Sequence, residues 1–346
     1  MPLPTSMQAW VSGAGPGREH LELSTLPVPT VDDNELLIQV HGAAMNFSDL
    51  LMVDDKYQVR PPRPFTPGQE VSGSVVAVGP GSENRLGDEV MAKVLWGGFA
   101  EFAIVRADMA LPAPASTRLT EAAAIPVSFT TAAVALTEAT LLREGETIII
   151  HAAAGAVGLA SVQVAKVLKA TVIATAGSDE KCDLAKSFGA DHAINYRKSN
   201  YREQALDLTG GAGVDVVLDP VGGDHALESL RSLAWCGRYL IVGFASGRVP
   251  KLPSDRLLLK GASAIGVYWN HDVDPEMVHR AERRLLPWLD EGVLRLCVDT
   301  TYELADLPVA LELLDHGGTK GKMVLRVGER PQSCPMLSSP AIACSI

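Results

Sequence analysis

Six short apolar runs between residues 146 and 269 constrain the fold of this chain more than any other feature. Their sequences are ETIIIHAAA, ATVIATA, DHAINY, VDVVLDPVG, GRYLIVGF and ASAIGVYW. Helical segments such as AVGLASVQVAKVLK, DEKCDLAKSFG and HALESLRSLAW separate most of them. Continuously apolar strands that alternate with helices are typical of a parallel sheet covered on both faces. Six of them predict an α/β chain with a complete doubly wound sheet.

The flanking segments have other patterns. From Gln8 to about Pro126, short β-type runs alternate with Gly and Pro, which predicts a β-rich domain built as a small barrel or sandwich. An Ala-rich stretch over residues 120–140 has helical spacing and opens on Thr120, a candidate helix cap. A helix over residues 275–292 precedes a mixed stretch that is too short for a third domain. We expect that stretch to return to the first domain.

These patterns divide the chain of 346 residues into two domains and a tail. We assign residues 1–127 and 270–330 to the β-rich domain and residues 128–269 to the doubly wound domain. Residues 331–346 are rich in Pro and Ser, and we expect them to form a flexible tail.

The net charge and the cysteine pattern limit which partners and which cellular compartment we expect for this chain. A formal net charge of -11 disfavours nucleic acid and anionic membranes, which both require a basic face. No apolar run reaches membrane-spanning length, and the first residues do not resemble a secretory signal. The five cysteines are scattered, which predicts reduced thiols in the cytoplasm or, as an alternative, in the mitochondrial matrix.

The turn after the first apolar run has the spacing of a dinucleotide-binding motif. Ala153, Gly155 and Gly158 match G-x-G-x-x-G with alanine in the first place, between a strand and a helix. Small residues are needed because the turn is tight, the backbone approaches a pyrophosphate and the helix packs against the strand. The sequence therefore predicts a dinucleotide site, with a purely structural turn as the alternative.

The residues at the end of the next strand bear on which coenzyme binds. A carboxylate in this place binds the ribose hydroxyls of NAD, but here Gly177 and Ser178 occur instead. Ser178 can donate a hydrogen bond, Lys181 supplies positive charge one turn later, and Tyr196 can close the same pocket. The alternative is an N-cap at Ser178 and a solvated lysine at 181. The missing acid and the nearby base together favour NADPH.

Long stretches resemble the medium-chain dehydrogenase/reductase superfamily, and within it the zinc-free quinone oxidoreductases related to zeta-crystallin. The matching stretches are MNFSDLLMVDDKYQVRPPRPFTPGQEVSGSV, HAAAGAVGLASVQVAK, GSDEKCDLAKSFGADHAINY, DPVGG and CGRYLIVGFASGRVPKLPSDRLLLKGASAIGVYW. The last is most similar to a branch of quinone oxidoreductase-like proteins. The resemblance covers Met7 to about Val327. It implies a GroES-like β-rich catalytic domain, an inserted Rossmann domain with a six-stranded parallel sheet, and a return of the chain to the first domain.

The resemblance also implies which residues surround NADPH. The helix entering the cofactor domain, the pyrophosphate turn, the 2′-phosphate pocket and the ends of later strands contribute Thr131, Ala154, Gly155, Ala156, Val157, Gly177, Ser178, Lys181, Tyr196, Gly223, Val242, Gly243, Phe244, Ala245, Ile265, Gly266, Val267 and Lys322. Lys322 has an alternative interpretation as a surface lysine at a strand start. Ligands of an open parallel sheet bind at the carboxyl ends of its strands, which supports the placement independently.

Metal ligands are missing from the places where zinc-dependent members of the superfamily keep them. Those members hold catalytic zinc through a Cys and a His, and here Asn46 and Gln69 occupy the corresponding stretches MNFSD and PGQE. Amides are poor zinc ligands. No cysteine precedes Cys182, so the four-cysteine structural lobe is missing too. We predict no metal, and hydride transfer to an electrophilic quinone or enone remains feasible.

Three residues are candidates on the acceptor side. By resemblance, Asn46 and Asp49 lie beside the nicotinamide and the substrate, where Asn46 can bind an acceptor carbonyl or the ribose and Asp49 can orient a neighbour. Their alternative role is a helix cap. Tyr57 can donate a proton to the reduced oxygen or simply pack. Leu51 stands where many of these reductases carry tyrosine, which disfavours simple benzoquinone as the substrate.

Three further aromatic residues have roles that the sequence leaves less defined. Tyr268 and Trp269 can supply aromatic surface across the cleft, or belong to the core or to a dimer interface. His151 ends the first strand, and we interpret it as a packed structural histidine. The resemblance also implies a homodimer through the edge strand near residues 262–269.

The leading hypothesis is an NADPH-dependent, zinc-independent oxidoreductase that transfers a hydride to a quinone or an α,β-unsaturated carbonyl. The alternatives are an enoyl-thioester reductase of the same superfamily and a non-catalytic NADPH-binding protein with a crystallin-like or regulatory role. The partner in the leading case is a small molecule.

Overall fold

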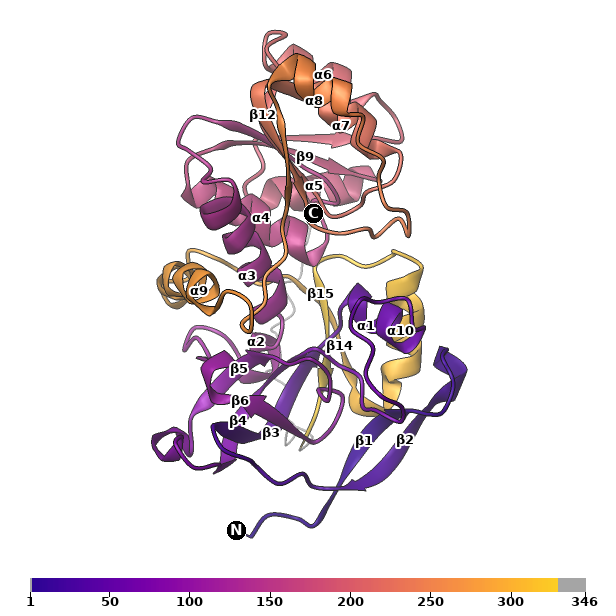
Figure 1. Ribbon diagram of the computed structural model, residues 1–346, viewed down its shortest axis with the longest axis vertical. Helices are drawn as coiled ribbons and strands as arrows, with labels where there is room; N and C mark the ends of the chain where they lie inside the picture. The colour runs from indigo at the N-terminus through magenta and orange to yellow at the C-terminus, as the bar shows by residue number, and fades with distance from the viewer. Residues whose placement is uncertain (1, 329–346) are drawn as a thin grey trace, which may run out of the picture.

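Two sheets organise the chain in the computed structural model, which describes residues 2–328. A six-stranded sheet and a seven-stranded sheet lie at opposite ends of an elongated molecule, and helices occupy the space between them (Figure 1). A separate two-stranded sheet pairs β1 (Ser6–Ser12) with β2 (Leu21–Pro27). The tail expected over residues 331–346, with Cys334 and Cys344, lies outside the described residues.

The six-stranded sheet is parallel throughout. Its strands are β8 (Thr147–Ile150), β9 (Thr171–Ala176), β10 (His192–Asn195), β11 (Val214–Asp219), β12 (Leu233–Ile241) and β13 (Ser263–Gly266). Their spatial order is β10-β9-β8-β11-β12-β13, and every neighbouring pair runs in the same direction. This is the order of a doubly wound dinucleotide-binding fold, with its reversal point between β8 and β11. The predicted Rossmann sheet is confirmed.

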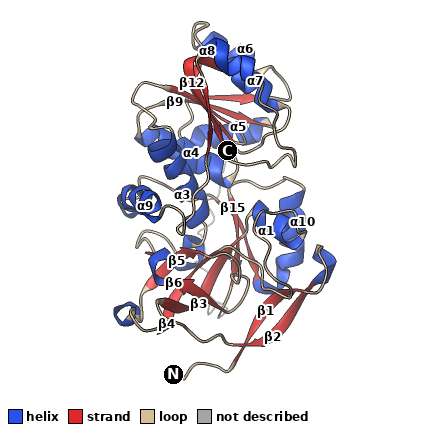
Figure 2. Cartoon of the chain, viewed as in Figure 1, coloured by secondary structure: helices blue, strands red, loops and turns tan. Residues whose placement is uncertain are grey.

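Helices cover both faces of this sheet (Figure 2). They are α4 (Ala156–Val167), α5 (Asp179–Ser187), α6 (Tyr201–Leu208), α7 (His225–Ser232) and α8 (Ser254–Lys260). Successive side chains of a strand point to opposite faces, so Ile148 and Ile150 enter one apolar cluster while Ile149 enters another. Two buried faces explain why the strands are apolar at nearly every position.

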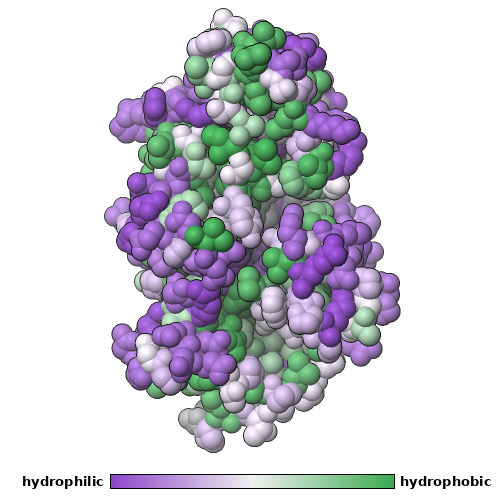
Figure 3. Space-filling model, viewed as in Figure 1, coloured by the Kyte–Doolittle hydropathy of each residue, from purple (hydrophilic) through white to green (hydrophobic). Residues whose placement is uncertain are grey.

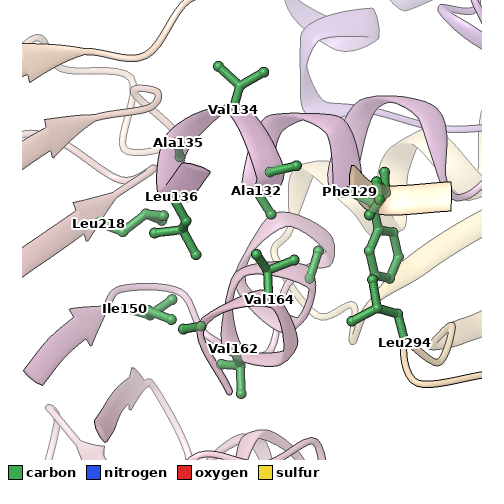
Figure 4. Packing of buried hydrophobic residues seen from close by; sticks show 14 of the residues in the cluster. Phe129, Ala132, Val134, Ala135, Leu136, Ile150, Val162, Val164, Leu218 and Leu294 are labelled. Atoms are coloured by element: carbon green, nitrogen blue, oxygen red, sulfur yellow. The ribbon is translucent and has the colours of Figure 1, made fainter. Parts of the chain in front are cut away.

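The predicted helix over residues 120–140 is wrong in one respect, because the structure has separate elements there. A short α2 (Leu119–Ala122) precedes α3 (Pro126–Ala133), which continues as a π-helical segment η4 (Val134–Ala139). Proline lacks an N–H and suits the first position of a helix, so Pro126 starts a new one. The N-cap of α2 is Arg118 rather than Thr120. Figure 4 shows Phe129 of α3 packed beside Leu294 in the main core.

The seven-stranded sheet belongs to the β-rich domain. Its first strands are β3 (Glu35–Ala44), β4 (Glu70–Val78), β5 (Glu89–Lys93), β6 (Phe102–Arg106) and β7 (Ala110–Pro112). Helix α1 (Phe47–Val53) follows β3, and single 3-10 turns occur at η1 (Arg18–His20), η2 (Glu83–Arg85), η3 (Ala107–Met109) and η5 (Leu304–Asp306).

The chain returns to this sheet after the parallel one. Helix α9 (Pro275–Asp290), predicted from the sequence, leads to β14 (Val298–Glu303), α10 (Leu307–Asp315) and β15 (Lys322–Arg326). Strand β15 pairs antiparallel with β3, which confirms the expected return. Among residues 2–328, none of the helices is both long enough and apolar enough to cross a membrane.

Candidate active site

A cleft of about 440 Å³ opens where the two domains meet, and the surface is visibly hollowed between the two halves (Figure 3). One wall comes from the carboxyl ends of β8, β9 and β11, and the other from the start of α1 and of β15. An open parallel sheet binds its ligands at this edge, beside the reversal of strand order. The predicted site residues should therefore meet in this cleft.

The glycine turn after β8 forms the floor of the cleft. A Cβ atom on Gly158 would lie 2.3 Å from the backbone oxygen of Ala152 and 2.7 Å from the Cα atom of Ala153, so only glycine fits. At Gly155 the nearest obstacle is that same oxygen at 3.3 Å. Gly155 is the N-cap of α4, whose twelve residues begin at the cleft. The amides at this helix start are suited to bind a pyrophosphate.

The floor is joined directly to the opposite domain. The Gly321 N–H donates to the Ala154 oxygen at 2.8 Å, and Gly155 and Gly321 form an isolated β-bridge. This contact places Lys322, the first residue of β15, next to the glycine turn.

One end of the cleft is cationic. A Cβ atom on Gly177 would lie 2.8 Å from the Tyr196 hydroxyl and 3.4 Å from Arg197 Nε, so these side chains enclose the end of β9. Lys181 Nζ donates to the Gly317 oxygen at 2.9 Å. Burial, and after it the charge of Arg197, lowers the pKa of Lys181. Arg197 forms no salt bridge within residues 2–328. Two nearby cations are suited to binding an anion.

The neighbouring acids are engaged elsewhere. Asp179 accepts hydrogen bonds from Lys198 and Asn195, and Glu180 pairs with Lys320 at 2.5 Å. Ser178 is the N-cap of α5 and accepts from the Lys181 N–H at 3.2 Å, as the alternative interpretation expected. Its hydroxyl is thus already in use as an acceptor.

A buried ionic network occupies the other end. Lys322 Nζ lies 2.5 Å from Glu70 Oε2 and donates to Asn46 Oδ1 at 2.6 Å. Asn46 Nδ2 donates to the same Glu70 oxygen at 2.8 Å, and the Val127 N–H donates to Oε1 at 2.5 Å. Lys322 is 5% exposed and Glu70 is fully buried, so the interpretation of Lys322 as a surface lysine is wrong.

Asp49 supports this network from behind. Its Oδ2 accepts from the Asn46 N–H at 2.8 Å, which joins the start of α1 to its first turn. Asp49 is fully buried, and Oδ1 has no partner among the described residues. Burial raises the pKa of Asp49 to about 7, against the opposing effects of the Asn46 amide and Lys322. This contact is the helix cap that the alternative interpretation expected, and the orienting role of Asp49 stays a prediction.

Tyr57 lies at the edge of this region. The pKa of its hydroxyl is raised by burial and then by Tyr268 and Asp49, while Gln69 and Ser48 lower it. Ser48 donates to the Gln69 side chain in turn. Tyr268 is 69% exposed.

Trp269 belongs to the core. It is buried, its Nε1 donates to the Thr131 hydroxyl at 3.0 Å, and Lys93 lies over its ring. His151 is also buried, with hydrogen bonds to Thr175 and Ser229, which confirms its packed structural character.

The residues at the position that holds catalytic zinc in zinc-dependent members of the superfamily do not fit a zinc ion here. The side chains at hand are the amides of Asn46 and Gln69 and the carboxylate of Glu70. The ammonium of Lys322 already occupies the position between Asn46 and Glu70 where a cation would bind. Neutral amides beside a fixed ammonium are unsuited to Zn²⁺.

About half of the predicted residues line the cleft. These are Asn46, Ala154, Gly155, Ala156, Val157, Gly177, Lys181, Tyr196, Ala245 and Lys322. Those that do not line it are Asp49, Tyr57, Thr131, Ser178, Gly223, Val242, Gly243, Phe244, Ile265, Gly266 and Val267. Gly223 nevertheless lies against Ser246, a lining residue.

Several lining residues were missed. They are Met45, Phe47, Ala152, Pro220, Val221, Ser246, Leu314, Gly317, Thr319, Gly321 and Met323. Arg197 was missed as well, although it directly follows Tyr196, and basic character beside a predicted phosphate pocket was the available signal.

The doubly wound sheet, its glycine turn and the cleft shared with a β-rich domain define a two-domain oxidoreductase that uses a nicotinamide cofactor. Family models agree with this class. The alcohol dehydrogenase GroES-like domain matches residues 32–115, and the zinc-binding dehydrogenase model matches residues 156–291.

Individual relatives identify the family within this class of oxidoreductases. Quinone oxidoreductase-like protein 2 of Bos taurus is 40% identical over 299 residues, covering 85% of this chain and 86% of that protein. The quinone oxidoreductase of Homo sapiens is 30% identical over 313 residues, or 89% of this chain and 94% of that one. The crystal structure of the Thermus thermophilus quinone oxidoreductase has a TM-score of 0.80 and 36% identity over 93% of this chain and all of that one. The chain belongs to the quinone oxidoreductase family of medium-chain dehydrogenases/reductases and is a quinone reductase-like oxidoreductase.

Proposed function

We propose that this protein is an NADPH-dependent, zinc-independent oxidoreductase that transfers a hydride to a quinone or an α,β-unsaturated carbonyl. The observation that carries the proposal is the cleft itself. It joins a cationic pocket at the end of β9 to the buried Asn46–Glu70–Lys322 network across the glycine turn. A volume of about 440 Å³ is in the range of small-molecule sites.

The preference for NADPH follows from the cationic end. Lys181, Arg197 and the Tyr196 hydroxyl can each donate to the 2′-phosphate, and Asp179 and Glu180 are held by other partners. A carboxylate at the end of β9 would repel that phosphate, and none stands there. The Thermus thermophilus relative is described in complex with NADPH, which supports the same choice.

At the other end, bound NADPH supplies the hydride and the chain's own residues bind and orient the acceptor. Lys322 has three N–H donors and uses two of them on Asn46 and Glu70. The third can bind an acceptor oxygen as negative charge develops on it. Apolar side chains of Met45, Phe47 and Met323 line the same wall, where they exclude water.

Zinc is not needed for this chemistry. A quinone or enone is already electrophilic, and the ammonium of Lys322 stands where a metal would polarise a substrate oxygen. The amides on the acceptor side of the cleft are a poor donor set for a metal. We therefore expect chelators to leave the initial rate of NADPH oxidation unchanged, measured at about 25 °C.

The edge strand β13 supports the proposed homodimer. It ends the parallel sheet, and Ser263 and Ala264 are exposed along it. Trp235, Leu258 and Leu259 are exposed as well, at 74%, 80% and 68%. Within residues 2–328, β13 pairs with β12 alone, and such a free strand edge is suited to pairing with a second copy about a two-fold axis.

The coenzyme assignment is tested with Lys181→Ala and Arg197→Ala. We expect each to raise the dissociation constant for NADPH roughly tenfold to one hundredfold, the cost of a lost charge-assisted hydrogen bond, and to change that for NADH little. Lys169→Ala, an exposed lysine paired with Glu144, is the matched control. Equal losses for both coenzymes would defeat the phosphate assignment.

The acceptor is tested by NADPH oxidation with a panel of quinones, enones and enoyl thioesters. Turnover with quinones or enones supports the proposal. Turnover confined to enoyl thioesters, or tight NADPH binding without any turnover, would favour one of the two alternatives raised by the sequence.

A further inference from the structure

Three metal-ligating side chains gather outside the cleft, where the chain passes from the parallel sheet back to the other domain. His271 lies in the turn before α9, and His279 and Glu282 lie on α9, three residues apart and so on one face. One ligand atom of each lies within 4.8 Å of those of the other two. None of the three lines the cleft.

Two of these side chains are buried without the hydrogen bonds that burial normally requires. His271 and Glu282 are each 4% exposed. Within residues 2–328, neither ring nitrogen of His271 has a hydrogen-bond partner, and Glu282 Oε2 has none either. The nearest approach is 3.5 Å, between His271 Nε2 and Glu282 Oε1. Buried polar atoms are nearly always bonded, so this cluster calls for a bound partner between its members.

The third side chain contacts the β-rich domain. His279 Nε2 lies 3.3 Å from the backbone oxygen of Asp108, which belongs to η3 of the β-rich domain. A neutral imidazole that donates through Nε2 keeps its lone pair on Nδ1. Metal-bound histidines commonly donate their other N–H to a carbonyl in this way.

The basic residues that flank Glu282 on α9 form no salt bridge with it within residues 2–328. Arg280 and Arg284 both pair with Glu138 of η4, at 3.1 and 2.7 Å, and Arg283 forms no salt bridge among these residues.

We propose that His271, His279 and Glu282 form a site for one divalent transition-metal ion, with zinc as the best-fitting species, separate from the coenzyme cleft. Two imidazoles and a carboxylate are a donor set that proteins use for zinc, and water completes four-coordination. The ion neutralises Glu282 and ties the turn before α9 to the helix and, through His279, to η3. The site lies outside the cleft, so it is compatible with zinc-independent chemistry there.

The test uses the full-length, untagged protein after removal of metal. Calorimetric titration with Zn²⁺ should give one ion per chain, and Co²⁺ should give the visible absorption of a four-coordinate site. Saturating zinc should raise the melting temperature by on the order of 5 °C. We expect His271→Gln, His279→Gln and Glu282→Gln each to weaken binding at least about tenfold. His192→Gln, which removes an exposed imidazole on β10, should leave binding unchanged.

The three variants keep the outcome decisive. His279 is only half-buried, so His279→Gln reports on the site if His271→Gln fails to fold. A wild-type chain that binds no zinc would overturn the proposal. Binding that survives all three substitutions, or is lost in His192→Gln, would overturn it too, because other groups would then hold the ion.

Discussion

Removing the ammonium of Lys322 should destabilise the protein more than any exposed substitution. In Lys322→Met the apolar volume is nearly kept, but Glu70 remains fully buried as a charge, with only Asn46 Nδ2 and the Val127 N–H as donors. Breaking a buried ion pair from one side typically costs about 3–5 kcal/mol. That is a large share of the roughly 5–15 kcal/mol by which domains are stable.

The double variant Lys322→Met with Glu70→Gln separates charge from packing. Both buried charges are gone, and replacing a buried pair by neutral groups is often nearly neutral for stability. We therefore expect the double variant to be more stable than Lys322→Met alone, with a coupling free energy of about 0.5–3 kcal/mol.

The assay is urea unfolding followed by fluorescence and circular dichroism together. The Lys322→Met midpoint should fall by about 1 M or more. Lys320→Met removes a lysine two residues away whose partner Glu180 is exposed, and its midpoint should stay close to that of the wild type. Strictly additive effects in the double variant, or a Lys322→Met midpoint equal to that of the wild type, would refute the ionic network.

Three further outcomes are expected. Burial raises the pKa of Asp49 in the folded protein to about 7, above its value in the unfolded chain. The protonated carboxyl therefore stabilises the fold at low pH, and this contribution is lost as the pH rises from about 4 to about 7. Asp49→Asn should reduce the change of the urea unfolding midpoint with pH across that window, and an unchanged pH dependence would contradict the assignment. Gly158→Ala should cost about 1–3 kcal/mol of stability because its Cβ meets the backbone of Ala152, whereas Gly155→Ala should mainly weaken coenzyme binding. Equal thermal unfolding midpoints for these two variants would disprove the packing argument. Ala264→Lys on the exposed edge of β13 should shift the mass measured by light scattering from dimer to monomer, and a monomeric wild type would rule out the dimer.

The parallel sheet was predictable because its constraint is local. Strands buried on both faces need apolar residues at nearly every position, as Ile148 to Ile150 show. This pattern can be recognised directly in the sequence. The glycine turn was predictable for a similar reason, since the clash at Gly158 arises with residues only a few positions away. The break before Pro126 could have been predicted from proline chemistry alone.

The ionic network was not predictable in the same way. Asn46 and Glu70 are 24 residues apart, and Asn46 and Lys322 are 276 apart, so no spacing in the chain brings them together. A lysine at the start of a strand has the same sequence signature whether it is solvated or buried. Only the pairing of β15 with β3, a tertiary event, determines that Lys322 faces a carboxylate.

The same limit explains the histidine–glutamate cluster. His279 and Glu282 have helical spacing that the sequence displays, but the burial of His271 beside them depends on the path of the turn before α9. Resemblance to relatives points to the cleft and not to this turn.

The position of β15 has a consequence for biosynthesis. A ribosome delivers β8 to β13 as one uninterrupted stretch, so the parallel sheet can fold while translation continues. The other sheet receives β15, and with it the cleft's ammonium, only after more than three hundred residues have emerged. A nascent chain thus carries the coenzyme-binding strands and glycine turn before β15 completes the acceptor wall that begins at α1. A stop codon anywhere ahead of residue 322 yields a product lacking both that strand and Lys322.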